Sequence, residues 1–213
     1  MKLGLQESFI GRRQCDMANV CSDTVVLFPK EDTPGNAVSR LKEDLLDCYP
    51  SMGIHADTRL VLLLERLNIP TDGICFRGDV VCMDIEDAYI CLELETAWNP
   101  LYDAYQKIAE HYGLDFVLRA EEPGERIFIN TDVYGVYLDV RYRVLLKLDA
   151  DAGGTVYEKM LREETDMEIY FFHESDMLEW FAKYGISAGS YDELERRLDS
   201  DYVCVNLYDT ICA

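Results

Sequence analysis

Basic residues are scarce in this sequence: its 213 residues include 20 Lys and Arg against 41 Asp and Glu, for a net charge of -21 at pH 7. Nucleic acids are held largely by Lys and Arg side chains that displace counterions from phosphates. An anionic membrane surface attracts proteins in the same way. Direct binding to nucleic acid or to such a membrane is therefore disfavoured, and the charge favours a basic protein partner instead.

Signatures of bound metals and cofactors are missing as well. The eight cysteines include no Cys-x-x-Cys pair, and the three histidines, His55, His111 and His173, lie in different segments. Zinc sites combine such residues at short spacings, and phosphate-binding loops need a glycine-rich signature that is also absent. We expect no metal and no cofactor.

Long hydrophobic runs are absent too. The longest aliphatic run is Leu60–Leu64, far short of the ~20 residues that span a bilayer. Residues 1–8 lack the apolar core of a signal peptide. We expect a cytoplasmic protein with reduced, mostly buried cysteines.

Hydrophobic residues, in contrast, make up 49% of the chain, which is enough for a packed core at this length. We expect an N-terminal arm over residues 1–16, a domain over 17–150 and a smaller acidic lobe over 151–213. Gly11-Arg12-Arg13 can be encoded by a ribosome-binding sequence a few codons before Met17. Met17 is therefore a candidate for the physiological start, and a flexible arm is the alternative.

The first domain is predicted to be α+β. Its strands are expected over 19–28, 80–85, 89–95, 114–119 and 126–131, and its helices over 33–49, 57–67 and 99–112. Alternation of apolar and polar residues also predicts one long strand over 136–148. The order strand, helix, strand, strand, helix, strand is that of a ferredoxin-like split βαβ sandwich, an antiparallel sheet with helices on one face.

The last third of the chain is dominated by acids. From Asp149 onward, sixteen acidic residues stand against five basic ones. The hydrophobic pattern predicts a strand over 167–172, helices over 175–184 and 191–198, and a closing strand over 202–208. Gly185-Ile186-Ser187-Ala188-Gly189 matches a nucleophile elbow literally, but no strand is predicted before it and no histidine follows it. Gly185 is better explained as a helix C-cap.

Three short segments resemble a known family. Met17-Ala18-Asn19-Val20-Cys21-Ser22-Asp23 is similar to the opening Met-Pro/Ala-Asn-Trp-Cys-Ser-Asn of YubB-type ferredoxin-like proteins. Thr96-Ala97-Trp98-Asn99-Pro100 resembles the Thr-Ala-Trp-Ser-Pro segment of that family, and Glu121-Glu122-Pro123-Gly124 resembles a later acidic turn. The resemblance covers about residues 17–148 and departs at Val20 and Asp23, where the family has Trp and Asn.

This resemblance implies a ferredoxin-like fold encoded by bacterial plasmids, phages or conjugative elements. It implies no catalytic residue. Carboxylate pairs such as Glu121 with Glu122 or Asp132 with Asp139 are expected to belong to a solvated face, because pairs arise by chance in so acidic a chain.

The leading functional hypothesis is a non-enzymatic interaction protein that binds a basic partner. The partner is expected to be a nucleic-acid-binding host defence protein, such as a CRISPR or restriction nuclease, whose positive groove would take carboxylates in place of phosphates. Asp192, Glu195 and Asp199 lie three and four residues apart, which suits one helix side. The predicted partner-binding residues are Asp176, Glu179, Asp192, Glu193, Glu195 and Asp199.

The alternative is a ligand-binding or enzymatic domain. Two arginines at alternate positions of one strand can clamp an anion on the open face of a sheet, although they can equally balance neighbouring acids. The residues predicted for this pocket are Tyr137, Asp139, Arg141 and Arg143.

Overall fold

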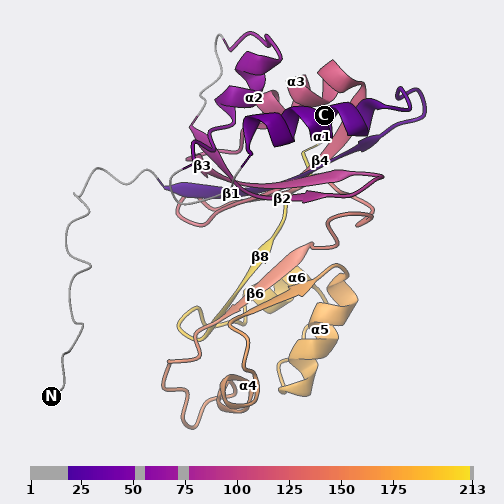
Figure 1. The fold of residues 1–213 in the computed structure, drawn as a ribbon. Coiled ribbons are helices and arrows are strands. Elements are labelled where there is room, and N and C mark those ends of the chain that lie inside the picture. Colours follow the sequence, from indigo (N-terminus) through magenta and orange to yellow (C-terminus); the bar gives the residue numbers. More distant parts are fainter. Residues whose placement is uncertain (1–18, 51–55, 72–76, 212–213) are drawn as a thin grey trace, which may run out of the picture.

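The computed structural model describes residues 19–50, 56–71 and 77–211. Within them the chain forms two antiparallel sheets, each with its own helices (Figure 1). The α+β class and the antiparallel sheet are therefore confirmed. The expected arm over 1–16 and the proposed start at Met17 lie outside the described residues.

The first sheet has five strands in the order β2-β3-β1-β4-β5, and every neighbouring pair is antiparallel. Figure 1 shows its three helices, α1, α2 and α3, together on one face. The strands are β1 (Val20–Pro29), β2 (Gly78–Ile85), β3 (Ile90–Ala97), β4 (Leu114–Glu122) and β5 (Ile127–Asn130), and the helices are α1 (Ala37–Cys48), α2 (Val61–Arg66) and α3 (Tyr102–Tyr112). We call this part the first lobe.

The core of the first lobe lies between sheet and helices. Alternate residues of β1, such as Val25 and Leu27, face this core and are fully buried. Helix α3 ends at Gly113, which adopts φ +71°, a left-handed conformation that glycine takes without strain. Helix α1 begins later than predicted because the Thr33 hydroxyl accepts the Lys30 amide and donates to the Gly113 carbonyl, so Thr33 closes a turn instead of capping a helix.

The second sheet has three strands in the order β7-β6-β8. Side chains such as Val144, Met160 and Phe181 form a separate core with no exposed surface. The strands are β6 (Tyr142–Leu146), β7 (Glu168–Phe171) and β8 (Val203–Leu207), and the helices are α4 (Glu158–Glu163), α5 (Glu174–Lys183) and α6 (Tyr191–Glu195). Sequence patterning missed α4. We call this part the second lobe.

The prediction of one long strand over 136–148 is wrong. Only β6 forms there, and it pairs with β7 and β8 in the second sheet. Residues before it form a loop, because the Asp132 carboxylate accepts the amides of Tyr137 and Leu138 at 2.6 and 2.9 Å. The side-chain amide of Asn130 (Nδ2) also donates to the backbone carbonyls of Leu138 and Val140. Such side-chain bonds to the backbone compete with strand pairing.

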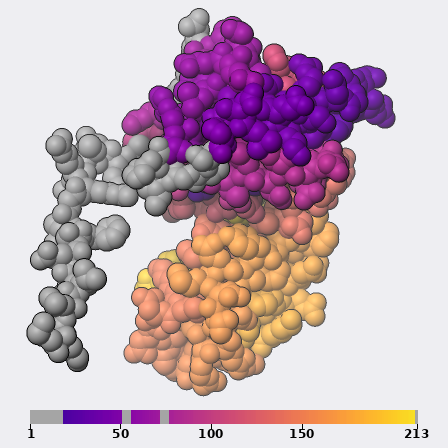
Figure 2. All heavy atoms as spheres, in the orientation of Figure 1, coloured from indigo at the N-terminus to yellow at the C-terminus, as the bar shows by residue number. Residues whose placement is uncertain are grey.

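The second lobe lies against the face of the first sheet that carries no helices (Figures 1 and 2). The Tyr208 ring packs edge-on against Phe128, and its hydroxyl donates to Glu121. Just beyond β8, the Asp209 amide donates to the Phe128 carbonyl, and the Asp209 carbonyl accepts the Asn130 amide. In the described part of the chain, no helix combines the length and hydrophobicity needed to cross a bilayer.

Candidate functional site

The predicted partner-binding acids lie on and after the last two helices. Asp176 and Glu179 lie on α5, Asp192 and Glu195 on α6, and all four are exposed. Within the described residues these four form no ion pair. We call the six predicted acids, Asp176, Glu179, Asp192, Glu193, Glu195 and Asp199, the acidic face.

The first turns of α5 and α6 are held next to each other. The Glu174 carboxylate accepts the Tyr191 amide at 2.6 Å, which ties the start of α5 to the start of α6. Asp176 and Asp192 therefore lie in neighbouring first turns, where the helix dipole favours carboxylates. The helix dipole thus stabilises these two carboxylates, which form no ion pair within the described residues.

Glu193 and Asp199 have structural partners of their own. Glu193 accepts the Gly189 amide at 2.7 Å and pairs with Arg197 at 2.5 Å. These contacts, the backbone bond first, lower the pKa of Glu193. Asp199 accepts the Asp201 amide at 3.0 Å. Because α6 ends at Glu195, Asp199 is not on the helix, and its expected helical spacing with Asp192 is wrong.

The residues of the predicted anion pocket lie beside different parts of the first sheet. Tyr137 stacks on Phe28, with ring centroids 4.6 Å apart. Arg143 instead pairs with Glu121, which lies opposite Ser22 in the register of β1 and β4. Phe28 and Ser22 are six residues apart on β1, or roughly 20 Å along a strand. Tyr137 and Arg143 therefore do not meet.

The two arginines of that pocket are already engaged. Arg143 is 9% exposed, and it contacts Glu121 at 3.3 Å and also binds Glu168. Its hydrogen bond lowers the pKa of Glu168. Arg141 donates to the Asn130 carbonyl at 3.2 Å, and Asp139 is exposed. Two carboxylates neutralise Arg143, so this side chain offers little net charge to an anion.

Arg143 does line a groove that the sequence did not reveal. The groove has a volume of about 600 Å³ and runs between the turn joining β4 to β5, strand β8 and α6. Three segments distant in sequence build it, so no single segment predicts it. Its lining comprises Pro123, Arg126, Phe128, Arg143, Leu145, Tyr191, Glu195, Leu198, Ser200 and Val203–Leu207.

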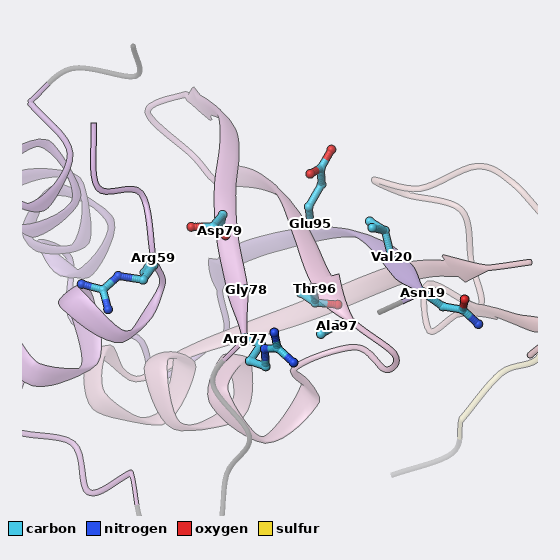
Figure 3. Close-up of a pocket in the computed structure, with 9 residues that line it drawn as sticks. All are labelled: Asn19, Val20, Arg59, Arg77, Gly78, Asp79, Glu95, Thr96 and Ala97. Atoms are coloured by element: carbon cyan, nitrogen blue, oxygen red, sulfur yellow. The ribbon is translucent and has the colours of Figure 1, made fainter. Parts of the chain in front are cut away.

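A second hollow of about 320 Å³ lies at one end of β1, β2 and β3. Figure 3 shows its charged side chains, Arg59, Arg77, Asp79 and Glu95, pointing in different directions. Arg59 is bound to Asp57 by two hydrogen bonds of 2.5 and 2.8 Å. These residues do not converge on a common point, so this hollow presents no arrangement for catalysis.

A buried carboxylate, that of Asp23, anchors the start of helix α3. Asp23, 2% exposed, accepts the Tyr105 hydroxyl at 2.6 Å, the Leu101 amide at 3.1 Å and the Cys21 thiol at 3.3 Å. Burial raises the pKa of Asp23. Burial, followed by the charge of Asp23, raises the pKa of Cys21 to about 12. Cys21 is therefore a protonated core thiol and a poor nucleophile.

Two carboxylates assigned to a solvated face are buried instead. Glu122 is 2% exposed and accepts the Gly124 amide at 3.1 Å. Asp132 is 4% exposed and holds the loop before β6. Both expectations are wrong because backbone amides of tight turns supply the partners that bury a carboxylate.

Comparisons with known proteins add no assignment. No family model, no curated protein and no solved structure matches the chain. In residues 19–50, 56–71 and 77–211, no group of three or more His, Cys, Asp or Glu side chains is arranged to hold a metal ion. The charges and contacts described above therefore define the candidate site.

Proposed function

We propose that this protein is a non-enzymatic interaction protein that binds a basic protein partner through its acidic face. The observation that carries the proposal is the exposure of Asp176, Glu179, Asp192 and Glu195 without ion pairs in the described structure. A net charge of -21 extends their field beyond contact distance. Such a field speeds the approach of a cationic partner and disfavours acidic competitors.

The partner we propose is a nucleic-acid-binding host defence protein, such as a CRISPR or restriction nuclease. Its positive groove is built to receive regularly spaced phosphates, and exposed carboxylates on two adjoining helix turns offer negative charge to the same groove. The protein would thereby act as a nucleic-acid mimic in the cytoplasm of a bacterial host. The resemblance of residues 17–148 to YubB-type proteins supports an origin in a plasmid, phage or conjugative element.

We also infer that the first lobe is a ferredoxin-like split βαβ unit extended by β5. The order β2-β3-β1-β4, with α1 before β2 and α3 before β4, supports this inference. The extra helix α2 and strand β5 are additions at its periphery. This lobe would act as the scaffold on which the acidic second lobe is displayed.

The experiment that tests the proposal is capture followed by displacement. The purified protein is immobilised, exposed to a bacterial lysate at low salt, and its bound proteins are identified by mass spectrometry. We expect a nucleic-acid-binding protein that elutes with salt and releases a labelled DNA duplex when the purified protein is added. Capture of proteins that keep their DNA, or binding indifferent to salt, would contradict the proposal.

A second candidate function rests on one atom. Arg143 Nε is buried and has no hydrogen-bond partner within the described residues. A small ligand in the groove beside Arg143 would satisfy it and raise stability, because a ligand that binds only the native state shifts unfolding. A thermal-shift screen with small anions and polar neutral compounds separates the interaction protein from the ligand-binding domain. An increase of several degrees in the unfolding temperature favours the ligand-binding domain.

A further inference from the structure

Strand β8 has one hydrogen-bonding edge that no other strand of its sheet covers. The Arg141 carbonyl accepts the Tyr208 amide, and the Lys147 amide donates to the Tyr202 carbonyl. This antiparallel register directs the even-numbered residues of β8 toward β6. The backbone N–H and C=O groups of Val203, Val205 and Leu207 therefore point away from β6.

Most of these outward groups are unpaired. The Val203 amide donates to Asp199 at 3.1 Å, and the Val205 carbonyl receives the Tyr191 hydroxyl at 3.4 Å. The amides of Val205 and Leu207 and the carbonyls of Val203 and Leu207 have no partner in the part of the chain that the structure describes. Two residues further on, Asp209 pairs on this same edge with β5, so the edge is in pairing geometry.

The composition of β8 is unusual for a free edge. Edge strands are normally protected by charged residues or proline, which discourage pairing with another chain. Val203–Leu207 reads Val-Cys-Val-Asn-Leu and contains neither, in a chain where 29% of residues are charged. Free edge β7, in contrast, carries Glu168. An uncharged edge in so charged a protein indicates a surface that is covered in use.

The groove of about 600 Å³ described above runs along this edge. Side chains that alternate along an added strand would meet two environments in this groove. Tyr191 and Leu198 pack against the core that contains Val205, whereas Arg143 lies opposite Asn206 in the register of β6 and β8. Arg143, on this second side, has a buried Nε with no hydrogen-bond partner among the described residues. Because Glu121 and Glu168 already neutralise Arg143, a neutral oxygen acceptor suits it better than an anion.

We propose that the groove along β8 binds an extended peptide segment of a partner protein, which pairs with Val203–Leu207 as a fourth strand of the second sheet. Backbone hydrogen bonds to Val205 and Leu207 would supply affinity, and alternation of side chains would supply specificity. The segment carries apolar side chains toward Tyr191 and Leu198, and a side-chain carbonyl or hydroxyl toward Arg143. Glu195 belongs both to the acidic face and to the lining of this groove, but the inference stands on the backbone groups of β8 and does not depend on binding through the acidic face.

The test uses short random peptides displayed on phage, selected against the full chain and then resynthesised. Each selected peptide is N-methylated at one residue at a time. Strand addition predicts that binding weakens about tenfold or more only at alternate residues, because only those N–H groups donate to β8. Hydrogen exchange of the complex should show new protection at the amides of Val205 and Leu207.

A pair of variants at one position separates backbone from side-chain effects. Val205→Pro removes an N–H that points away from β6, which an edge strand tolerates. Val205→Ala loses the same side chain but keeps the N–H. We expect Val205→Pro to abolish peptide binding and Val205→Ala to keep it within a few-fold, with the amides of β6 protected equally in both.

Three outcomes would overturn the proposal. The first is a selection that yields no peptide, and the second is a peptide whose N-methyl scan shows no alternation. The third is concentration-dependent dimerisation of the free protein that protects the Val205 amide, because the edge would then belong to a second copy of this chain. A negative result for the β8 edge does not contradict partner binding through the acidic face, because that binding is tested separately by DNA displacement.

Discussion

The two lobes treat their sheet edges differently. In the first lobe, the β2 edge is covered by residues 58–60, since the Val80 amide donates to Thr58 and the Leu60 amide donates to Gly78. The β5 edge is covered at Asp209. In the second lobe both edge strands, β7 and β8, lack a further strand within the described residues. Part of each edge of the first sheet is thus covered, whereas the second lobe combines the edge strands β7 and β8 with the acidic face.

The largest expected effect breaks one lobe and spares the other. Phe181 is fully buried in the second core, and Leu92 is fully buried in the first. Replacing Phe181 by Ala should lower the free energy of unfolding by about 3–5 kcal/mol, since it removes a large buried side chain and leaves a cavity. Hydrogen exchange should show faster opening of β6, β7 and β8 with β1 and β3 still protected, and Leu92→Ala should show the converse. Equal opening of both sheets in each variant would mean that the lobes unfold as one unit.

The next effect concerns the contact between lobes. Arg143 bridges Glu121 of the first sheet and Glu168 of the second. Arg143→Met keeps much of the volume but leaves Glu121, beside the buried Tyr208, with only the more distant Arg119 at 3.8 Å. The loss should cost about 2–3 kcal/mol, less than for a fully buried pair, because Arg119 still faces Glu121 and Glu168 reaches solvent. Urea denaturation measures this loss. Arg141→Met, which removes an arginine that has no ion pair among the described residues, is the matched control and should cost less than half as much.

Asp23 sharpens the comparison through pH. Burial raises its pKa in the folded state, so the protonated form is favoured by folding. Its contribution to stability is therefore present below its ordinary pKa and is lost as pH rises through the raised value. The difference in unfolding free energy between wild type and Asp23→Asn should shift against the wild type as pH rises. Asp23→Ala should cost about 1–3 kcal/mol, because it leaves the Tyr105 hydroxyl and Leu101 amide without an acceptor. A pH-independent difference would contradict this account of Asp23.

Glu168 should show the opposite and smaller dependence. The hydrogen bond from Arg143 lowers its folded-state pKa, so its contribution is present above its ordinary pKa and is lost as pH falls through the lowered value. Because the Glu168 side chain is 39% exposed, solvent screening keeps the effect to a few tenths of a kcal/mol. At neutral pH, Glu168→Gln should have about the same free energy of unfolding as the wild type has when Glu168 is protonated. A larger loss in Asp166→Asn, which changes an exposed carboxylate that forms no ion pair among the described residues, would contradict the assignment.

Sequence patterns predicted the elements that are determined locally. Glycine at 113 marked the end of α3 because a left-handed residue is needed there. The alternation over 136–148 predicted the burial of Leu138 and Val140 correctly, but Val136 is 70% exposed. The predicted strand does not form before β6, because hydrogen bonds of the Asn130 and Asp132 side chains fold that backbone into a loop. Alternation reports which residues are buried and says nothing of their pairing partners.

The acidic face and the β8 groove also differ in how far the sequence predicts them. Charge predicted the exposure of Asp176, Glu179, Asp192 and Glu195, because carboxylates without partners are rarely buried. The β8 groove could not be predicted, since Phe128, Arg143 and Val205 come from three distant segments. The one local signal was the absence of charge in Val203–Leu207, which acquires meaning only once β8 is known to lie at an edge.

The central claim is that the position of the acids, and not net charge alone, determines partner binding. Its most direct test compares two triple variants with the same charge change. Asp176, Glu179 and Asp192 become Lys in one, and the exposed Glu43, Glu65 and Glu86 of the first lobe become Lys in the other. We predict that the first variant loses the captured partner at least tenfold in affinity while the second binds within a few-fold of wild type. Equal losses in both variants would contradict the claim.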